Sequence, residues 1–258
     1  MSSASDAMIL ELDNVCFAYE KNGAFIGDLS FAVGEREFIG LLGANGSGKS
    51  TILKLGCGIL RPSSGNLLLW KKPLHSYNNK DRAKLISYLP QTLDFSVPFT
   101  IRELVGMGLY PYETLPSISV DEALEMVGLL DRGNSHLTDL SGGERRRTLI
   151  AMTLLQGAGL LLLDEPLANL DIKYQIELVK LLKNLIKERN ISVVMALHDI
   201  NFALRFEKVM VIKNGKILGA GKPESVLTSP LIKESFDVAV EIRSTGTGST
   251  YISYENNF

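Results

Sequence analysis

The stretch GANGSGKS at residues 43–50 decides the fold of this chain. It fits the pattern G-x-x-x-x-G-K-[ST], and it follows a short apolar run at residues 38–42 and opens a segment of helical character from Lys49 to Cys57. Glycines allow the backbone N–H groups of such a loop to turn toward one point, and the start of the helix adds partial positive charge. The stretch therefore predicts a phosphate-binding loop, with a glycine-rich turn before a structural helix as the alternative.

Within this loop, Lys49 is expected to reach the outer phosphates of a nucleotide, and Ser50 is expected to ligate Mg²⁺. The predicted nucleotide-binding residues of the loop are Gly43, Asn45, Gly46, Ser47, Gly48, Lys49, Ser50 and Thr51.

A second apolar run, LLLL at residues 160–163, ends in Asp164 and Glu165. A buried strand of this kind delivers two carboxylates to the carboxyl edge of a parallel sheet, where ligands bind. Asp164 is expected to hold the Mg²⁺ shell, and Glu165 is placed to polarise an attacking water. Buried strands that end in acids are common, so this prediction depends on the phosphate loop.

Residues 140–144 read LSGGE. Ser141 and Glu144 have capping-box spacing, so a helix is predicted to begin here. Gly142 and Gly143 leave the first amides of that helix bare, which makes its N-terminus a second site suited to phosphate. An ordinary capped helix would show the same spacing, so these residues alone leave both interpretations open.

The pattern along the chain indicates an α/β fold. Apolar runs at 38–42, 160–163 and 191–197 are predicted as buried strands, and a helix is predicted over 172–186. Strands that alternate with helices imply a parallel sheet with right-handed crossovers. Asn214-Gly215 predicts a hairpin between the two flanking strands.

Other segments depart from this pattern. Strands are expected over 8–19 and 25–33, close to the N-terminus. Capping boxes begin at Thr100 and Ser119, and no strand pattern is evident from about Ile101 to Asp139, so a helical insertion is predicted. Residues 244–250 indicate a loop within a small C-terminal strand pair.

Composition excludes several classes of protein. The 258 residues are 45% hydrophobic with a net charge of −2, which gives no electrostatic reason to expect nucleic acid as the main partner. Cys16 and Cys57 lack CxxC spacing, which argues against a disulfide scaffold or zinc site and suits a reducing cytosol. Residues 1–8 do not resemble a secretory signal, and no apolar run approaches the ~20 residues of a membrane span. If the chain serves transport, another chain must supply the pore.

The LSGGE stretch, placed before a strand that ends in Asp164-Glu165, resembles the signature of the ABC ATPases. The resemblance covers nearly the whole chain, and further elements occur in that family's order. They are Tyr19, similar to the aromatic residue that stacks on adenine; Gln91 after Tyr88-Leu89-Pro90, similar to the Q-loop; Leu170-Asp171, similar to the D-loop; and His198 before Asp199, similar to the switch histidine. Taken singly, Tyr19 and His198 also fit a packing role.

The resemblance implies a P-loop NTPase (RecA-like) core with a mainly parallel sheet, an N-terminal antiparallel β subdomain and an inserted α-helical subdomain. The whole chain, residues 1–258, would form a single ABC ATPase domain. Residues 1–91 and 142–258 would supply the core with its β subdomain, and residues 92–141 would form the helical subdomain, with the signature at its end.

The resemblance also implies an ATPase that works as a head-to-tail homodimer closed by ATP. Ser141 and Gly143, with Gly142 and Asp171, would contact the nucleotide held by the other subunit. The implied catalytic residues are Glu165, His198 and Gln91; the implied Mg²⁺ site is Ser50, Gln91 and Asp164.

As partners, the resemblance implies integral membrane permease subunits gripped by the helical subdomain. A periplasmic or extracellular substrate-binding protein would act indirectly, and nucleic acid would not be a partner. The chain would lie peripherally at the cytoplasmic face of the cell membrane.

Within the family, the chain looks like the importers of iron-siderophores, haem and cobalamin, notably at residues 100–112 and 198–201. It departs from them at Leu109 and Tyr112, where that group usually has Arg and His. Leu167 replaces a frequent Thr, and Arg146 replaces a frequent Gln. None of the four is expected to touch a catalytic role, but the first two lie where a partner would dock.

Three alternatives remain at this stage. A zinc or manganese importer would need the same ATPase chemistry. A soluble ABC protein of translation or DNA repair usually carries two cassettes or a long coiled-coil insertion, and this chain shows neither. A P-loop kinase or GTPase would not need residues 140–144. His75 and His136 match no motif and are predicted to lie on the surface.

Overall fold

The computed structural model describes residues 8–19, 25–91, 99–113, 118–168, 170–244 and 250–254. In chain order, its strands are β1 (Met8–Phe17), β2 (Ile26–Gly34), β3 (Phe38–Leu42), β4 (Ser64–Leu69), β5 (Lys72–Pro73), β6 (Ile86–Leu89), β7 (Leu160–Leu163), β8 (Ser192–Leu197), β9 (Lys208–Lys213), β10 (Lys216–Gly221), β11 (Val240–Ser244) and β12 (Thr250–Tyr254). Its α-helices are α1 (Lys49–Gly56), α2 (Asn79–Ala83), α3 (Ile101–Gly106), α4 (Val120–Met126), α5 (Gly142–Leu155), α6 (Ile172–Arg189), α7 (Ile200–Ala203), α8 (Pro223–Val226) and α9 (Ser229–Phe236). Short 3₁₀ helices are η1 (Leu74–Ser76), η2 (Met107–Leu109), η3 (Leu130–Arg132) and η4 (Leu137–Asp139).

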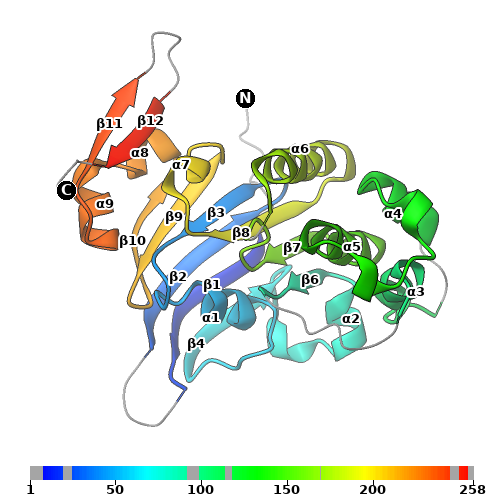
Figure 1. Cartoon of the computed structure of the whole chain (residues 1–258). Helices are drawn as coiled ribbons and strands as arrows, with labels where there is room; N and C mark the ends of the chain where they lie inside the picture. Colours follow the sequence, from blue (N-terminus) through cyan, green and yellow to red (C-terminus); the bar gives the residue numbers. More distant parts are fainter. Residues whose placement is uncertain are drawn as a thin grey trace, which may run out of the picture.

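The central sheet has the strand order β10-β9-β3-β8-β7-β6, shown in Figure 1. Strands β9, β3, β8, β7 and β6 run parallel, and β10 is antiparallel to β9. In the register, Leu42 pairs with Leu197, Leu163 with Met195, and Leu89 with Leu163. The carboxyl ends of β3, β6, β7 and β8 therefore meet at one edge, as the predicted parallel sheet requires.

Both faces of this sheet are buried, because alternate residues of each strand belong to two separate cores. In β7, Leu161 and Leu163 pack with α5 and α6, whereas Leu160 and Leu162 pack with α1 and the N-terminal strands. Burial of each such leucine contributes about 1.5–3 kcal/mol. The continuous apolar run that predicted this strand thus reflects burial on both faces.

The N-terminal strands form a second, antiparallel sheet of order β2-β1-β4-β5. This confirms the expected antiparallel β subdomain. Strands β4 and β5 were not predicted, because SGNLLL shows no alternation and β5 has only two residues. Helix α1 lies between the two sheets, so the phosphate loop is held on both sides (Figure 1).

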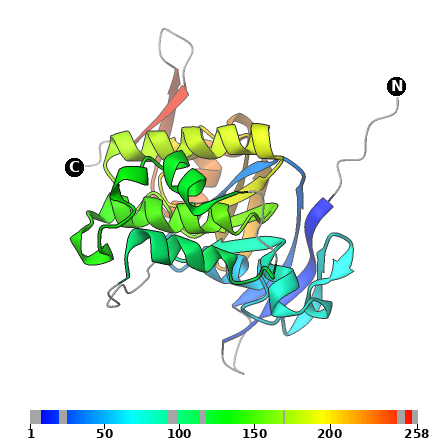
Figure 2. The ribbon, with the colours of Figure 1, turned by 90° about the vertical axis from the view of Figure 1, so that its right-hand side faces the viewer.

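The predicted helical insertion is confirmed within the described residues. Both capping boxes are formed, at Thr100 with Glu103 and at Ser119 with Glu122. Figure 2 shows α3, α4 and α5 packed as neighbours, and the buried side chains of all three belong to one core. Residues 92–98 and 114–117 lie outside the described part, and the division at residues 92–141 stays a prediction.

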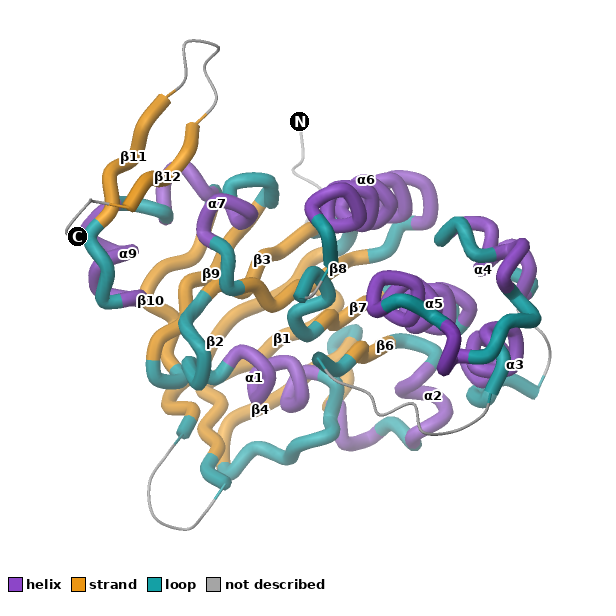
Figure 3. Tube along the Cα trace, viewed as in Figure 1, coloured by secondary structure: helices purple, strands orange, loops and turns teal. Residues whose placement is uncertain are grey.

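The C-terminal third confirms the predicted hairpin and strand pair. Asn214 and Gly215 both adopt positive φ, as a tight β9–β10 turn requires. Strands β11 and β12 form a ribbon beside α7 (Figure 3), and a reciprocal pair of hydrogen bonds joins Asn201 to the backbone of Ile252.

Residues 1–7 and 245–249, part of the terminal and loop segments predicted above, lie outside the described residues. Within the part described, no helix is long and apolar enough to cross a membrane.

Candidate nucleotide site

The loops that leave the carboxyl edge of the central sheet surround one open cavity of about 580 Å³. It is lined by phosphate-loop residues 44–51 together with Gln91, Glu165 and His198. Phe25 and Phe236 also line it, and no sequence pattern identified them. The fold therefore brings together residues that lie more than a hundred positions apart, from Ala44 to His198.

The phosphate loop needs its glycines for reasons of space and backbone conformation. Gly46 and Gly48 have φ of 77° and 111°, and a Cβ on Gly43 would lie 2.4 Å from the carbonyl oxygen of Ile212. No side chain caps α1, so its first amides remain available. The Ser47 hydroxyl is buried and has no hydrogen-bond partner among the described residues. The loop thus offers unsatisfied donors, which fits a phosphate group.

Lys49 is 4% exposed, and its ammonium group lies inside this loop. Nζ donates to the carbonyl oxygens of Gly43 at 2.8 Å and Ala44 at 3.2 Å. It also lies 3.4 Å from Oε1 of Glu165. The cation therefore joins the phosphate loop to the second of the two acids.

Ser50 and Asp164, which the sequence analysis assigns to one Mg²⁺ site, lie in contact. The Ser50 hydroxyl donates to Oδ1 of Asp164 at 3.0 Å, and the Tyr88 hydroxyl donates to Oδ2 at 3.2 Å. Burial raises the pKa of Asp164, and burial beside this acid raises the pKa of Tyr88. A hydroxyl and a carboxylate in contact form the oxygen-only donor set that Mg²⁺ prefers, so these residues fit the ion.

Glu165 is 9% exposed and has a φ of 46°, in the left-handed region. The Gln91 amide nitrogen donates to its Oε2 at 2.8 Å, and Nδ1 of His198 lies 3.9 Å from the same oxygen. The three side chains predicted as catalytic therefore meet at the cavity. The carboxylate of Glu165, in the turn that follows β7, contacts Lys49 through one oxygen and Gln91 through the other.

Arg146 was not predicted to take part in the site, but the structure places it directly behind these residues. It is 7% exposed, and its guanidinium donates to four backbone carbonyls in the Gln91 and Glu165 segments. Burial lowers its pKa to about 10, an effect opposed by the nearby Asp164 and Glu165 carboxylates.

Tyr19 lies beside the loop and is 59% exposed. Its hydroxyl is 2.8 Å from Oγ1 of Thr51, and its ring meets Phe17 and Phe25 edge-on. The residue is thus not part of the core, and one side of an aromatic ring next to the loop is open. Stacking on adenine stays a prediction.

The signature residues lie apart from this cavity. Ser141 and Glu144 form the predicted capping box at the start of α5, in which the Glu144 carboxylate accepts from the Ser141 amide at 3.0 Å and from its hydroxyl at 2.8 Å. These bonds lower the pKa of Glu144. Ser141, Gly142 and Asp171 are exposed, and neither they nor Gly143 lines the cavity. One copy of the chain therefore does not unite its two predicted phosphate sites.

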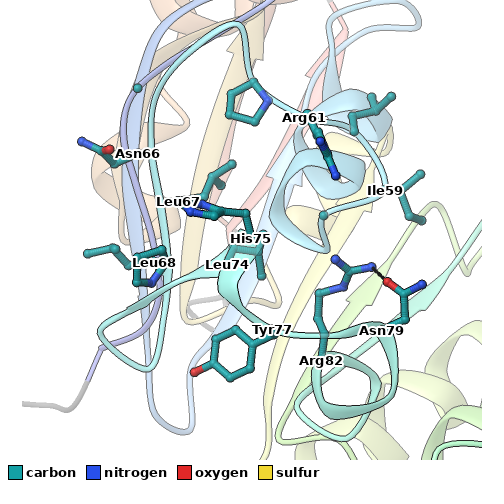
Figure 4. A pocket seen from close by; sticks show the side chains of 15 residues that line it. Ile59, Arg61, Asn66, Leu67, Leu68, Leu74, His75, Tyr77, Asn79 and Arg82 are labelled. Carbon is teal, nitrogen blue, oxygen red and sulfur yellow. Dashed lines mark hydrogen bonds between the residues drawn. The ribbon is translucent and has the colours of Figure 1, made fainter.

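A second cavity, of about 470 Å³, lies between α2, β4 and the loop after α1 (Figure 4). Arg61, His75 and Arg82 line it, and it contains none of the predicted site residues. His75 and His136 are exposed, which confirms that they lie on the surface.

Comparison with known proteins agrees with this geometry. The sequence profile of the family described as ABC transporter matches residues 26–168. This chain belongs to the ABC transporter family. The matched segment contains the phosphate loop, the signature and the acid pair, so the family resemblance noted in the sequence is confirmed.

Among curated relatives of this ABC transporter chain, the iron(3+)-hydroxamate import ATP-binding protein FhuC of Bacillus subtilis is 37% identical over 84% of the chain and 84% of its own length. The hemin import ATP-binding protein HmuV of Rhodopseudomonas palustris is 36% identical over 91% of this chain and 90% of its own length. The cobalamin import ATP-binding protein BtuD of Halobacterium salinarum is 34% identical over 84% of this chain. The matched region spans only 56% of that relative's own length.

Solved structures show the same fold. One is a putative metal-chelate type ABC transporter in an inward-facing conformation, with a TM-score of 0.82 at 25% identity. The matched region covers 97% of this ABC chain and 98% of that transporter's chain. A dimeric ATP-binding cassette bound to ADP and Pi, in a post-hydrolysis state, has a TM-score of 0.74 at 26% identity over 83% of this chain and 99% of its own. The expected P-loop NTPase architecture is therefore confirmed.

Proposed function

We propose that this chain is the ATP-hydrolysing subunit of a multi-chain ABC importer. One observation carries the proposal: Lys49, the Ser50–Asp164 pair and the Gln91–Glu165 pair meet around a single cavity. A phosphate cradle, an oxygen-rich ion site and an acceptor carboxylate are the parts that phosphoryl transfer to water needs.

In this proposal, the amides of residues 43–51 and the Lys49 ammonium hold the phosphates of ATP, and Tyr19 stacks on the adenine. Ser50 and Asp164, joined by Gln91, would hold Mg²⁺, which when bound neutralises charge on the phosphates. The Ser47 hydroxyl, which lacks a partner among the described residues, supports the cradle because a phosphate oxygen would satisfy it.

Glu165 would accept a proton from the attacking water. Its support is its position at the cavity, where Gln91 holds one carboxylate oxygen and Lys49 lies near the other. His198 would contact the γ-phosphate and help to orient the water. Catalysis would arise mainly from positioning and charge stabilisation in a site fixed before the substrate binds.

The proposed working unit is a head-to-tail homodimer. Ser141, Gly142, Gly143 and Asp171 would contact the ATP held by the second copy. Their separation from the cavity of their own chain supports this, because an exposed helix N-terminus with two glycines can bind a phosphate that a second copy holds. The similar dimeric cassette bound to ADP and Pi is consistent with such pairing.

The transport role is supported by the relatives, which are named as import subunits for hydroxamate, hemin and cobalamin. We therefore propose an iron-siderophore, haem or cobalamin importer, rather than a zinc or manganese importer or a soluble ABC protein. The chain would work at the cytoplasmic face of the membrane, together with a substrate-binding protein outside. A permease would dock on the helical insertion, where Tyr110 is 79% exposed beside Met107.

Size-exclusion chromatography with light scattering on Glu165→Gln, with and without Mg-free ATP, tests this proposal. We expect a monomer that becomes a dimer only with ATP, because the ATP is bound but is not consumed. Adding Ser141→Arg should block the dimer while the monomer still binds ATP, since the arginine fills the signature contact without touching the phosphate loop. Wild-type turnover in Glu165→Gln would contradict the assignment of the base. Normal ATP-driven dimerisation of the Ser141→Arg form would contradict the composite site.

A further inference from the structure

The guanidinium of Arg146 joins three segments that are distant in the sequence. Nη2 donates to the carbonyl of Asp164 at 2.8 Å, and Nε donates to the carbonyl of Pro166 at 3.2 Å. Nη1 is shared between the carbonyls of Pro90 and Gln91, at 3.0 and 3.1 Å. From these contacts we infer that Arg146 is a positioning residue that fixes Glu165 and Gln91 relative to the signature helix α5, an inference that rests on the proposed function.

The two bonds to Asp164 and Pro166 enclose Glu165. Its φ of 46° is a conformation that a residue with a Cβ rarely adopts, and such strain persists only where the surroundings hold it. The bond to the Asp164 carbonyl restrains the peptide group that precedes Glu165, and the bond to the Pro166 carbonyl restrains the peptide group that follows Pro166. The direction of its carboxylate therefore depends on Arg146, although the two side chains share no hydrogen bond.

The choice of backbone partners matters for the chemistry. Had the guanidinium paired with a carboxylate, it would have occupied oxygens that the site needs. Instead, the Asp164 carboxylate stays with Ser50, and the Glu165 carboxylate stays with Gln91. The positive charge still lies near both acids and is buried with them, so it offsets part of their negative charge.

The position of Arg146 along α5 connects the two predicted phosphate sites. Helix α5 begins after Ser141, and five residues of α-helix span roughly 7.5 Å. The capping box and the Arg146 bonds thus lie on the same rigid end of one helix. A shift of this end, when Ser141 meets ATP on a second copy, moves the carbonyl anchors of Glu165 and Gln91 in its own chain.

Arg145 offers a matched control on the same helix. Its guanidinium also donates to two backbone carbonyls, those of Leu137 at 3.1 Å and Thr138 at 3.1 Å, but these lie in the helical insertion. Both arginines anchor α5 through main-chain bonds, and only Arg146 reaches the catalytic segments.

The test is the rate of ATP hydrolysis under saturating MgATP for Arg146→Met and Arg146→Lys, with Arg145→Met as the control and with the Kd for Mg-free ATP measured in parallel. We expect kcat to fall roughly 10- to 100-fold in Arg146→Met, which removes every donor to the four carbonyls, because a small misplacement of catalytic groups has an effect of this size. Arg146→Lys, which keeps the charge but cannot span four carbonyls, should also be slow. The Kd should stay within about twofold, since the phosphate loop is untouched.

A double-mutant cycle separates positioning from general stability. Single-turnover hydrolysis in Glu165→Gln should change less than about twofold when Arg146→Met is added, because the group that Arg146 positions is already lost. The inference would be overturned by wild-type kcat in both Arg146 variants, by an equal loss in Arg145→Met, or by fully additive losses in the cycle. Wild-type turnover in Glu165→Gln would instead contradict the assignment of the base, and a wild-type chain that hydrolyses no ATP would refute the proposed function. If Arg146→Met does not fold, Arg146→Lys decides the result by the same measurements.

Discussion

The side-chain amide of Gln91 donates a 2.8 Å hydrogen bond to Oε2 of Glu165, across 74 positions of sequence. The bond joins the loop after β6 to the turn after β7, two neighbouring parallel strands. A neutral donor at this point stabilises an ionised carboxylate without neutralising it. The pair therefore couples the position of the proposed base to that of the Gln91 segment.

Replacing Gln91 with glutamate should slow hydrolysis. Gln91→Glu keeps the shape of the side chain but places a second carboxylate against Glu165, and like charges in contact repel each other. The repulsion should displace the carboxylate of Glu165, and a small misplacement of a catalytic group lowers kcat by roughly 100-fold. The measurement is kcat under saturating MgATP. Gln91→Ala removes the donor without adding charge, and an equal or greater loss in Gln91→Ala would contradict the expectation.

The parts of the site that sequence predicted correctly are those set by local patterns. The capping boxes that begin at Thr100, Ser119 and Ser141 each join residues three positions apart, and all three are formed. The contact of Ser50 with Asp164 spans 114 positions, yet it could be predicted because each residue follows or opens an element whose type was evident. Parallel register then places both residues at the same edge of the sheet.

The parts that sequence missed depend on tertiary register alone. Tyr88 contacts Asp164 because Leu89 pairs with Leu163. The strand β6 has only four residues, so it is too short to show a periodic pattern from which this contact could be predicted. Arg146 finds its partners 18 to 56 positions away, all of them backbone atoms, which no side-chain motif can reveal. Helix α6 was expected to end at Ile186 but continues to Arg189, where Asn190 in the left-handed conformation ends it.

Lys49→Met should weaken nucleotide binding without unfolding the protein. The ammonium group is a buried donor within the phosphate loop, and a lost hydrogen bond to a charged group lowers affinity by roughly 10- to 100-fold. Isothermal titration with Mg-free ATP gives the Kd, and Lys183→Met, on the exposed face of α6, removes the same charge elsewhere. Equal Kd values for wild type and Lys49→Met would count against the phosphate-loop assignment.

The two cysteines should differ in reactivity. Burial raises the pKa of the Cys57 thiol to about 11, whereas Cys16 is half-buried. In the folded protein at about pH 8 little Cys57 thiolate exists, so an aromatic disulfide reagent should modify Cys16 first and Cys57 only on unfolding. Because the folded pKa is raised, the Cys57 thiol favours the folded state below its ordinary pKa, and this contribution is lost as pH rises toward 11. Comparable reaction rates in Cys16→Ser and Cys57→Ala would contradict this assignment.

Gly215→Ala should destabilise the fold and weaken ATP binding together. Gly215 has a φ of 71°, and a Cβ there would lie 1.9 Å from the carbonyl oxygen of Phe25, so the β9–β10 turn must shift. The same residue donates its backbone N–H to the carbonyl of Ser47 at 2.8 Å, so the shift reaches the phosphate loop. Backbone strain alone should lower the free energy of unfolding by roughly 1–3 kcal/mol.

Gly106→Ala is the matched control for this substitution. Gly106 ends α3 with helical backbone angles, and a Cβ there meets nothing within 4 Å. Alanine should therefore stabilise the protein by about 0.4–1 kcal/mol, through lower entropy of the unfolded chain, and leave ATP binding unchanged. Guanidinium unfolding and ATP titration on both variants distinguish the two effects. The contrary outcome is a Gly215→Ala variant that loses stability but binds ATP as tightly as Gly106→Ala. The β9–β10 turn would then stabilise only the sheet, and the phosphate loop would keep its conformation without that turn.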